Sequence, residues 1–352
     1  MKGLKYLLVM AISITVGLGG FSTTASASRD SLQRYIITDM TSEEFGFWEI
    51  DDFVSADIIN GFIDSDTGNM SFLPNKNITR AEFTKIIINV LGIPTQSGPQ
   101  KFDDVTPGRW YYDYINTASS LGIINGYSAE EFKPGSFITR GQMAAMIVRA
   151  FKDTVPFPGY TGQMFPDVPN HASFSEEINK AASLGIIQGY SDNTFKSGNL
   201  ANRVQAVVIM YRAISNEYES PIQDNIVEAH VKDFLTEEAN ANLNLEQSLE
   251  LYDRYTTGFY AAYAKDIVKY NNELIDKGYE ITTSANLDNI QLSTDFITDR
   301  FAEVTVTGTS NYAKFINPDG HVEEKNSTIN NGFYLLKKDH TGIWKIYNQY
   351  PE

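Results

Sequence analysis

Three arginines stand at the same place in a repeated phrase. The phrase reads FLPNKNITRAEF at 72–83, FKPGSFITRGQM at 132–143 and FKSGNLANRVQA at 195–206, and each arginine follows a phenylalanine by eight residues. The arginines are Arg80, Arg140 and Arg203. A guanidinium can hold a carboxylate through two parallel hydrogen bonds, which lysine cannot match. The triplication favours an anion-binding role, and a structural salt bridge with a neighbouring acid is the alternative.

Glycines and aspartates recur in the same register. The phrases ADIINGF at 56–62, LGIINGY at 121–127 and LGIIQGY at 184–190 contain Gly61, Gly126 and Gly189. The phrases FDDV at 102–105 and FPDV at 165–168 contain Asp104 and Asp167, and the same spacing reaches Asp39 in a degenerate copy, ITDM. For the aspartates we favour a structural role, capping the first helix of each unit, over ligand binding. Aromatic residues accompany these phrases at Trp110, Tyr127 and Tyr190.

Each unit must position these residues with two helices. In the second unit Ile115, Ala118 and Leu121 recur at helical spacing, and Gly122 suits a left-handed helix end. The second helix of each unit is expected to begin at the arginine. In the first unit Thr79 and Glu82 have the spacing of a capping box, which places the arginine at a helix N-terminus that also favours anions. A unit of about 60 residues buries little apolar surface alone, so we expect the three to pack into one body.

These phrases resemble the S-layer homology family, which carries FxDV, GxxxGY and ITRAE phrases in sets of three. The resemblance covers residues 32–95, 96–158 and 159–215. It implies a mainly α, pseudo-threefold bundle of helix-loop-helix repeats that binds secondary cell-wall polymers of Gram-positive bacteria in grooves between repeats. It also implies which residues line a groove, namely Arg80, Arg140, Arg203, Asp39, Asp104, Asp167, Trp110, Gly61, Gly126 and Gly189.

The three units depart unequally from that pattern. The first carries an insertion at 64–69, which we interpret as a polar hairpin tip, because Asn75 stands where a calcium loop needs glutamate. The third has Asn202 in place of threonine before Arg203, and Ser173 stands where the second has Trp110. We therefore expect unequal grooves, with the groove that uses Arg203 contributing least.

A different pattern follows the repeats. Residues 216–224 read as a linker, and 225–277 are helical in pattern. In this stretch a mixed leucine and aromatic stripe is expected to form core, at Leu245, Leu249, Tyr252, Phe259, Tyr263 and Tyr270. After Gly278 the period changes to two, with a strand near 302–307 and a hairpin formed by 333–337 and 343–347. The order predicts a small α+β domain over 225–352 with an antiparallel sheet, and it resembles the nuclear-transport-factor-2-like (cystatin-like) cone.

The N-terminus indicates the cell compartment, and the composition argues against several kinds of partner and cofactor. Lys2 and Lys5 precede an apolar run, and Ala25-Ser26-Ala27 follows it, so residues 1–27 are expected to be a cleaved secretory signal that leaves no membrane span. Acidic residues number 44 against 28 basic ones, a net charge of −16, which argues against a nucleic-acid partner. The sequence has no cysteine and four histidines, none paired at metal-ligand spacing, so neither metal nor cofactor is expected.

The sequence thus predicts a secreted protein held non-covalently on the surface of a Gram-positive cell wall. The expected partner is an anionic, pyruvylated secondary cell-wall polysaccharide, with peptidoglycan as a further possibility, while the C-terminal domain binds an unidentified ligand or protein. Nucleophile-elbow, P-loop and zinc-protease motifs are absent, so no enzyme is predicted. Two alternatives stay open. One is a structural subunit of a surface layer, and the other is a wall-tethered enzyme whose pocket in 225–352 would hold a carboxylate of raised pKa.

Overall fold

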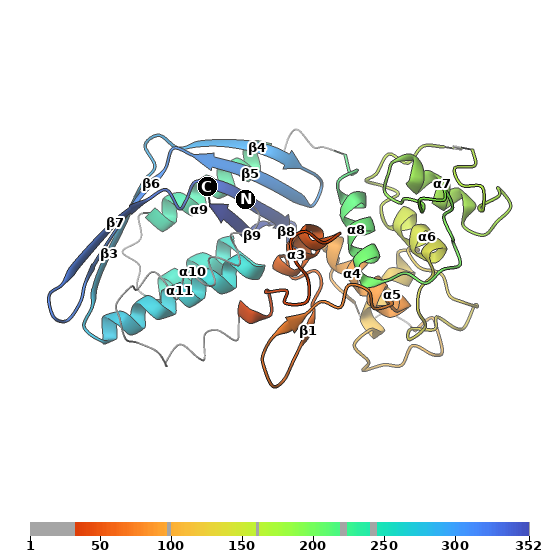
Figure 1. The fold of residues 1–352 in the computed structure, drawn as a ribbon, viewed down its shortest axis with the longest axis horizontal. Helices are drawn as coiled ribbons and strands as arrows, with labels where there is room; N and C mark the ends of the chain where they lie inside the picture. Colours follow the sequence, from red (N-terminus) through yellow and green to blue (C-terminus); the bar gives the residue numbers. More distant parts are fainter. Residues whose placement is uncertain (1–31, 97–99, 160–161, 219–223, 240–244, 352) are drawn as a thin grey trace.

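The computed structural model describes residues 32–96, 100–159, 162–218, 224–239 and 245–351. The predicted signal peptide at 1–27 lies outside these residues. Figure 1 shows a helical part formed by the repeats beside a part in which antiparallel strands cover helices. Among the described residues, no helix is both long and apolar enough to cross a membrane.

Each repeat contributes two helices. The first helices are α3 (Phe47–Ser55), α5 (Tyr112–Ser120) and α7 (Ser175–Ser183), and the second helices are α4 (Arg80–Val90), α6 (Arg140–Ala150) and α8 (Arg203–Ile214). Every second helix begins at the recurring arginine, as predicted. The residue before that arginine closes a capping box in all three, because Asn202 accepts from the N–H of Gln205 just as the two threonines do from their partners.

The first helices follow the predicted pattern with one exception. Ile115 and Ala118 are fully buried in α5, and Gly122 after it has the left-handed φ of 70°. Leu121, however, is 45% exposed, so its predicted burial is wrong. It lies at the C-terminal end of the helix, where the chain turns away from the neighbouring helix α4.

Backbone hydrogen bonds join the three units in a closed ring. The N–H of Ile138 donates to the carbonyl of Ile78 at 3.0 Å, that of Ala201 to Ile138 at 2.9 Å, and that of Ile78 to Ala201 at 3.0 Å. Helix α4 packs on α5, α6 on α7, and α8 on α3. The second helix of each unit therefore contacts the first helix of the next, and the third unit contacts the first.

The insertion in the first unit forms a hairpin, as predicted. Strands β1 (Phe62–Ile63) and β2 (Met70–Ser71) pair antiparallel. At the tip the carboxylate of Asp64 accepts the backbone N–H groups of Asp66 and Thr67. This carboxylate thus orders the turn itself, and the part of the chain that the structure describes contains no cluster of residues suited to hold a metal ion.

The C-terminal part is an α+β domain, as predicted. Its helices are α9 (Asp224–Ala239), α10 (Leu245–Tyr255) and α11 (Gly258–Asp276). Its strands are β3 (Glu280–Asn286), β4 (Gln291–Ile297), β5 (Phe301–Thr307), β6 (Ser310–Ile316), β7 (Val322–Ser327), β8 (Gly332–Lys338) and β9 (Trp344–Pro351). They form an antiparallel sheet of order β4-β5-β8-β9 and a second of order β3-β6-β7. Of the predicted core stripe, Phe259 is buried, whereas Leu245 is 39% exposed and that prediction is wrong.

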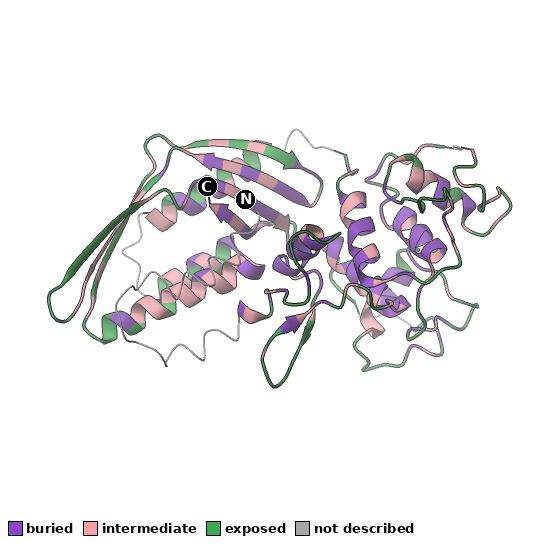
Figure 2. Ribbon diagram, in the orientation of Figure 1, coloured by how far each residue is buried: buried purple, intermediate pink, exposed green. Residues whose placement is uncertain are grey.

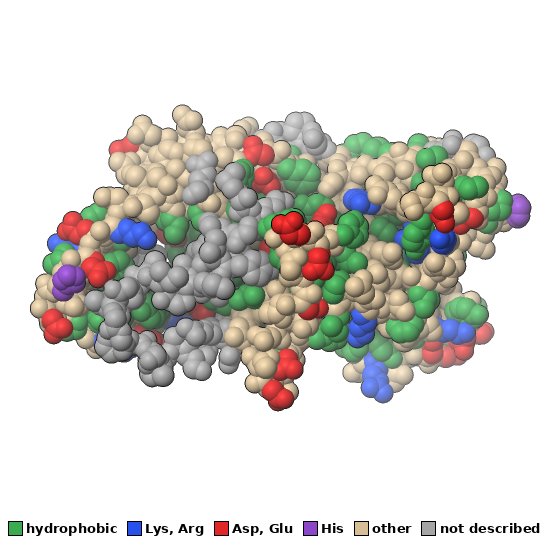
Figure 3. Space-filling model, in the orientation of Figure 1, with side chains coloured by type: hydrophobic (Ala, Val, Ile, Leu, Met, Phe, Trp, Pro, Cys, Tyr) green, Lys and Arg blue, Asp and Glu red, His purple; other side chains and the backbone are tan. Residues whose placement is uncertain are grey.

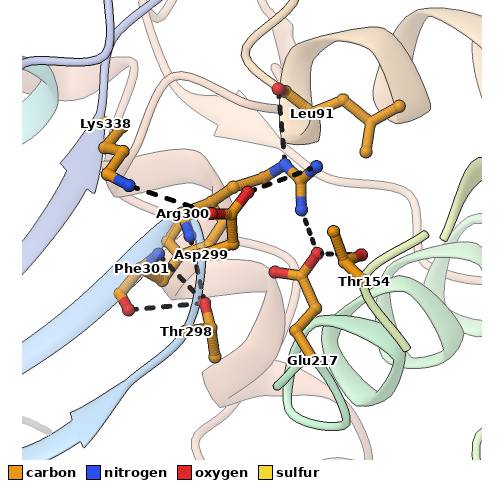
Figure 4. Close-up of polar contacts among 8 residues, drawn as sticks. All are labelled: Leu91, Thr154, Glu217, Thr298, Asp299, Arg300, Phe301 and Lys338. Carbon is orange, nitrogen blue, oxygen red and sulfur yellow. Dashed lines mark hydrogen bonds and ion pairs between the residues drawn. The ribbon is translucent and has the colours of Figure 1, made fainter. Parts of the chain in front are cut away.

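One apolar core extends across both parts, and a second lies within the C-terminal domain. Phe301, Leu335 and Tyr347 of the sheet pack into the same cluster of buried side chains as the repeats, and Figure 2 shows buried residues running from one part into the other. Glu217, in the stretch read as a linker, is only 5% exposed. Its carboxylate pairs with Arg300 and accepts the hydroxyl of Thr154 at 2.7 Å (Figure 4). The start of the predicted linker is therefore a packed joint.

Candidate functional site: the junctions between units

Each recurring arginine reaches across to the next unit. Arg80 donates from Nε to the carbonyl of Phe132 at 2.8 Å and from Nη2 to that of Asn125 at 3.1 Å. The equivalent acceptors are Phe195 and Gln188 for Arg140, and Phe72 and Asn60 for Arg203, at 2.8–2.9 Å. We call these contacts the first, second and third junction, after the unit that supplies the arginine. At each one a guanidinium ties down the residue before the recurring glycine and the phenylalanine of the loop.

The arginines are buried cations without a close anion. Their exposed fractions are 6%, 6% and 4%, and within the described residues none has a carboxylate at ion-pair distance. Burial lowers the pKa of each arginine, opposed by nearby acidic groups such as Asp104 at the first junction. A guanidinium stays charged in proteins and has five N–H donors, of which the two carbonyls occupy two. The salt bridge considered from sequence is thus replaced by carbonyl contacts.

The recurring aspartates order the loop that presents the carbonyl. Asp104 accepts the N–H groups of Phe132 and Lys133, at 2.8 and 2.6 Å. Asp39 and Asp167 do the same in their units, at 2.7–2.8 Å. The residue after each phenylalanine has a left-handed φ of 57–61°. None of the three first helices has a side-chain cap, so capping by these aspartates is wrong, because their carboxylates are engaged by this loop instead.

The recurring glycines stand where the chain leaves no room for a side chain. A Cβ atom at Gly126 would lie 2.1 Å from the carbonyl oxygen of Ser128, and one at Gly189 would lie 2.6 Å from a ring carbon of Phe165. At Gly61 it would lie 2.1 Å from the sulfur of Met70. The glycines therefore shape the turn whose preceding carbonyl receives the arginine.

Exposed aromatic side chains accompany the first junction. Trp110 is 53% exposed, and the Nζ atom of Lys85 in α4 lies 5.9 Å from its ring centroid. Tyr127 is 65% exposed, with the Nζ atom of Lys133 at 3.3 Å from its ring. A cation is attracted to the face of an aromatic ring. Both rings still keep much of their surface exposed to solvent. The first junction thus gathers Arg80, two lysines and two accessible rings.

The other two junctions differ in their aromatics. At the second, Tyr190 lies 4.9 Å from Arg140, and at the third, Phe62 lies 5.0 Å from Arg203. Phe45, which is 63% exposed, was missed from sequence although it stands 65 residues before Trp110, the spacing of the glycines. Its neighbour Gly46 touches Val204 of α8, which places Phe45 at the third junction.

Ser173 belongs to a different junction from the one predicted. Its neighbour Phe174 closely approaches Gly141, the residue after Arg140. The position without tryptophan therefore lies at the second junction. The third junction keeps its capping box and two exposed aromatics, so the sequence argument for ranking Arg203 last loses its basis.

Comparison with known proteins bears on these units. Three segments of the chain match the S-layer homology domain. They are residues 54–84, 101–144 and 165–206, so each S-layer homology match contains one of the three junction arginines. Asp39 lies outside them, yet its contacts are those of Asp104 and Asp167.

The relatives that share this similarity include an enzyme and surface-layer proteins. The chain is 32% identical over 165 residues to an amylopullulanase of Thermoanaerobacterium thermosulfurigenes, 46% of this chain and 8% of that protein. It is 29% identical over 208 residues to the surface-layer 125 kDa protein of Lysinibacillus sphaericus, 57% and 17% of the two chains. It is 26% identical over 190 residues to the S-layer protein sap of Bacillus anthracis, 53% and 22%. The similarity thus spans less than a quarter of these relatives and does not select between enzyme and structural protein.

The C-terminal domain shows part of the signature expected of an enzyme. Glu238 in α9 accepts the hydroxyl of Tyr252 at 2.6 Å, and burial raises the pKa of Glu238 more than this hydrogen bond lowers it. A cavity of about 220 Å³ lies elsewhere, at the joint between the two parts, where Leu91, Arg300 and Lys338 line it. The carboxylate of raised pKa and this cavity are therefore separate features.

Proposed function

We propose that the three units form a pseudo-threefold bundle that anchors this protein non-covalently to the wall of a Gram-positive bacterium. The ligand is an anionic polymer, such as a pyruvylated secondary cell-wall polysaccharide, bound at the junctions. The observation that carries this proposal is the buried arginine, repeated at three equivalent junctions and held by carbonyls of the next unit, with exposed aromatic rings nearby at 4.9 Å from Arg140 and 5.0 Å from Arg203. The S-layer homology matches and the relatives named as surface-layer proteins support wall anchoring in general.

The electrostatics of the junctions favour an anion despite the acidity of the chain. A net charge of −16 opposes the long-range approach of an anionic polymer, so binding depends on short-range contacts. Figure 3 shows acidic and basic side chains interspersed on one face of the molecule. A guanidinium that has lost much of its water gains from a carboxylate at close range. The first N–H groups of the second helices do not contribute as expected from sequence, because those of Arg80, Arg140 and Arg203 already donate to backbone carbonyls.

The residues divide into two roles under this proposal. Arg80, Arg140 and Arg203, with aromatic side chains such as Trp110, contact the polymer. The three aspartates and three glycines position the loops and turns that surround each arginine. Because the first junction has an exposed tryptophan, Trp110, with Lys85 over its ring, we rank it first. The second, which has Ser173 in place of tryptophan, ranks last.

The test is co-sedimentation with purified cell-wall sacculi, either intact or chemically stripped of secondary polymer. We expect binding to intact sacculi only. Trp110→Ala, which removes an exposed ring and leaves the core intact, should weaken binding about tenfold, and Arg80→Ala at least as much. Arg254→Ala, at an exposed arginine of the C-terminal domain, is the matched control and should bind as the natural chain does.

The outcomes separate the possible partners. Equal binding to intact and stripped sacculi would identify peptidoglycan as the partner, and binding to neither would refute wall anchoring. A larger loss of binding for Arg140→Ala than for Arg80→Ala would contradict the ranking of junctions. Circular dichroism of each variant distinguishes lost contacts from lost structure.

The C-terminal domain carries a separate part of the proposal. We infer a cone similar to the nuclear-transport-factor-2-like fold, because α9 packs on β4 and β5 while α11 packs on β3 and β9. We propose that this domain is displayed to bind a ligand or protein outside the wall. Assembly into a surface layer is a second candidate, supported by the relatives of that name. An enzymatic site around Glu238 is a third, supported by its raised pKa.

A further inference from the structure

Strand β7 forms one edge of the sheet β3-β6-β7. Figure 1 shows these strands extending past the body of the C-terminal domain. Strand β3 forms the opposite edge and contacts α9 and α11, whereas β7 pairs with β6. Residues 322–326 of β7 are all exposed (Figure 2). In an antiparallel pair alternate backbone groups point away from the partner, so this edge presents N–H and C=O groups to solvent.

This edge lacks the features by which other edges of the domain avoid pairing. Strand β4 has a bulge between Thr294 and Phe296, and β9 pairs with β8 through a register shift and ends in Pro351. Bulges and prolines disrupt addition of a further strand. Strand β7 instead pairs with β6 through six consecutive residues without a shift. It is regular enough to accept another strand.

The charges on β7 determine which strand can pair with it. Its sequence is VEEKNS over 322–327, with two acids beside one lysine. In an antiparallel pair of two β7 strands centred between Glu324 and Lys325, each of these residues faces the other type on the second strand. Val322 then faces Ser327, and Glu323 faces Asn326. Directly opposed residues share a face of the sheet, and opposite charges there are stabilising.

We propose that this edge is a self-association surface, where β7 pairs antiparallel with β7 of a second copy of the chain. The two three-stranded sheets then form one continuous sheet of six. Lys314 of β6 lies 3.8 Å from Glu324 within one chain, so each face carries a row of alternating charge, Lys314, Glu324 and then Lys325 of the second copy. This inference is independent of wall binding.

The pairing is weak by its size. One strand pair buries less surface than a standard protein interface, so we expect a dimer that forms at high micromolar concentration. Charges at its centre make it sensitive to salt. Chains held on a common surface gain effective concentration, which favours a weak contact of this kind.

The test is sedimentation equilibrium of the purified chain over a range of concentrations. We expect the mass to rise from that of the monomer toward twice that value. Glu324→Lys and Lys325→Glu each place like charges opposite one another twice, and each should raise the dissociation constant at least tenfold. The double variant restores unlike pairs and should return the constant to within about threefold of the original. Glu280→Lys, which changes the same charge on the opposite edge strand β3, is the matched control and should change little.

The outcomes decide the proposal. A chain that stays monomeric at several hundred micromolar refutes it. A dissociation constant that none of the three β7 variants changes would place the contact elsewhere and also refute the proposal. So would a double variant that fails to restore the affinity lost in the single variants. Assemblies that grow beyond two copies contradict a closed pairing of edges.

Discussion

The recurring glycines show how closely the chain approaches itself at the junctions. At Gly126 the nearest atoms to a Cβ would be backbone oxygens of Ser128 and Glu131 and a ring carbon of Phe102, at 2.1–2.8 Å. Backbone atoms cannot rotate away as a flexible side chain can. The neighbouring carbonyl of Asn125 receives Arg80, so a shift of this turn also moves an acceptor of the arginine.

We therefore predict that Gly126→Ala destabilises the protein by about 1–3 kcal/mol, the usual cost of an added methyl group that the structure cannot accommodate. Gly135→Ala is the control, because its Cβ would meet nothing within 4 Å and its φ is not left-handed. That variant should be neutral or slightly stabilising. Urea unfolding followed by circular dichroism measures both. Equal stability of the two variants would contradict the close approach.

For individual residues, the repeat spacing predicted more than the recognisable motifs alone. The repeat spacing predicted Asp39 in a copy as degenerate as ITDM, and its two hydrogen bonds match those of Asp104 and Asp167. It did not predict the partners of the arginines. Backbone carbonyls leave no mark on residue type, so the choice between anion, acid and carbonyl could not be made from the sequence.

At the scale of elements, the loop before each second helix depends on one carboxylate. Burial alone would raise the pKa of Asp167, but the N–H groups of Phe195 and Lys196 stabilise its charged form and lower the pKa below 3.8. Lys196 holds a left-handed φ of 57°, which costs free energy for a residue with a side chain. The carboxylate offsets that cost.

We predict that Asp167→Asn lowers the free energy of unfolding at pH 7 by about 1 kcal/mol, a value reduced for the exposure of the carboxylate. Because the native pKa is depressed, the stabilisation is fully present above pH 3.8 and is lost as the pH falls through the native pKa. The difference between the two proteins should therefore be constant from pH 7 to about 5 and shrink below about 3.8. Unfolding curves across this range measure it, and a difference that persists at the lowest pH would exclude the charge as its source.

Elements were predictable where signals are local. The capping box at Thr79 and Glu82, the hairpin at 64–69 and the end of α11 at Gly278 all depend on neighbouring residues. The junction to which Ser173 belongs depends on which unit packs against which. That order follows from the ring closure between the third and first units, to which the sequence gives no local signal.

At the scale of the whole molecule, the two parts are joined by buried polar contacts as well as by apolar packing. Arg300 donates to the carbonyl of Leu91 in the first repeat at 3.4 Å and pairs with Glu217 at the start of the predicted linker (Figure 4). Burial raises the pKa of Glu217 more than Arg300 and Thr154 lower it. The change to a period of two predicted a strand near 302–307 but not that Phe301 at its start is buried against the repeats, because periodicity identifies a face and not its partner.

We predict that the two parts unfold in a single transition. A variant retaining only Trp110 reports on the repeats and one retaining only Trp344 on the sheet, and their urea midpoints should coincide. Arg300→Met should lower the free energy of unfolding by about 3 kcal/mol by stranding a buried carboxylate, and adding Glu217→Gln should recover part of the loss. Two separated midpoints in the natural chain would show that the parts are independent.

The closed ring of units also determines how the molecule responds to a mechanical load. The joint contacts residues at the ends of α4, α6 and α8, such as Leu91 and Thr154, whereas the junction arginines begin those helices. If the junctions bind the wall polymer as proposed, a pull on the C-terminal domain enters at one end of the helices and reaches the ligand at the other. Because Arg203 ties the third unit to the first, the units cannot peel away one after another. Such an anchor shares tension among its three contacts and releases only when several give way together.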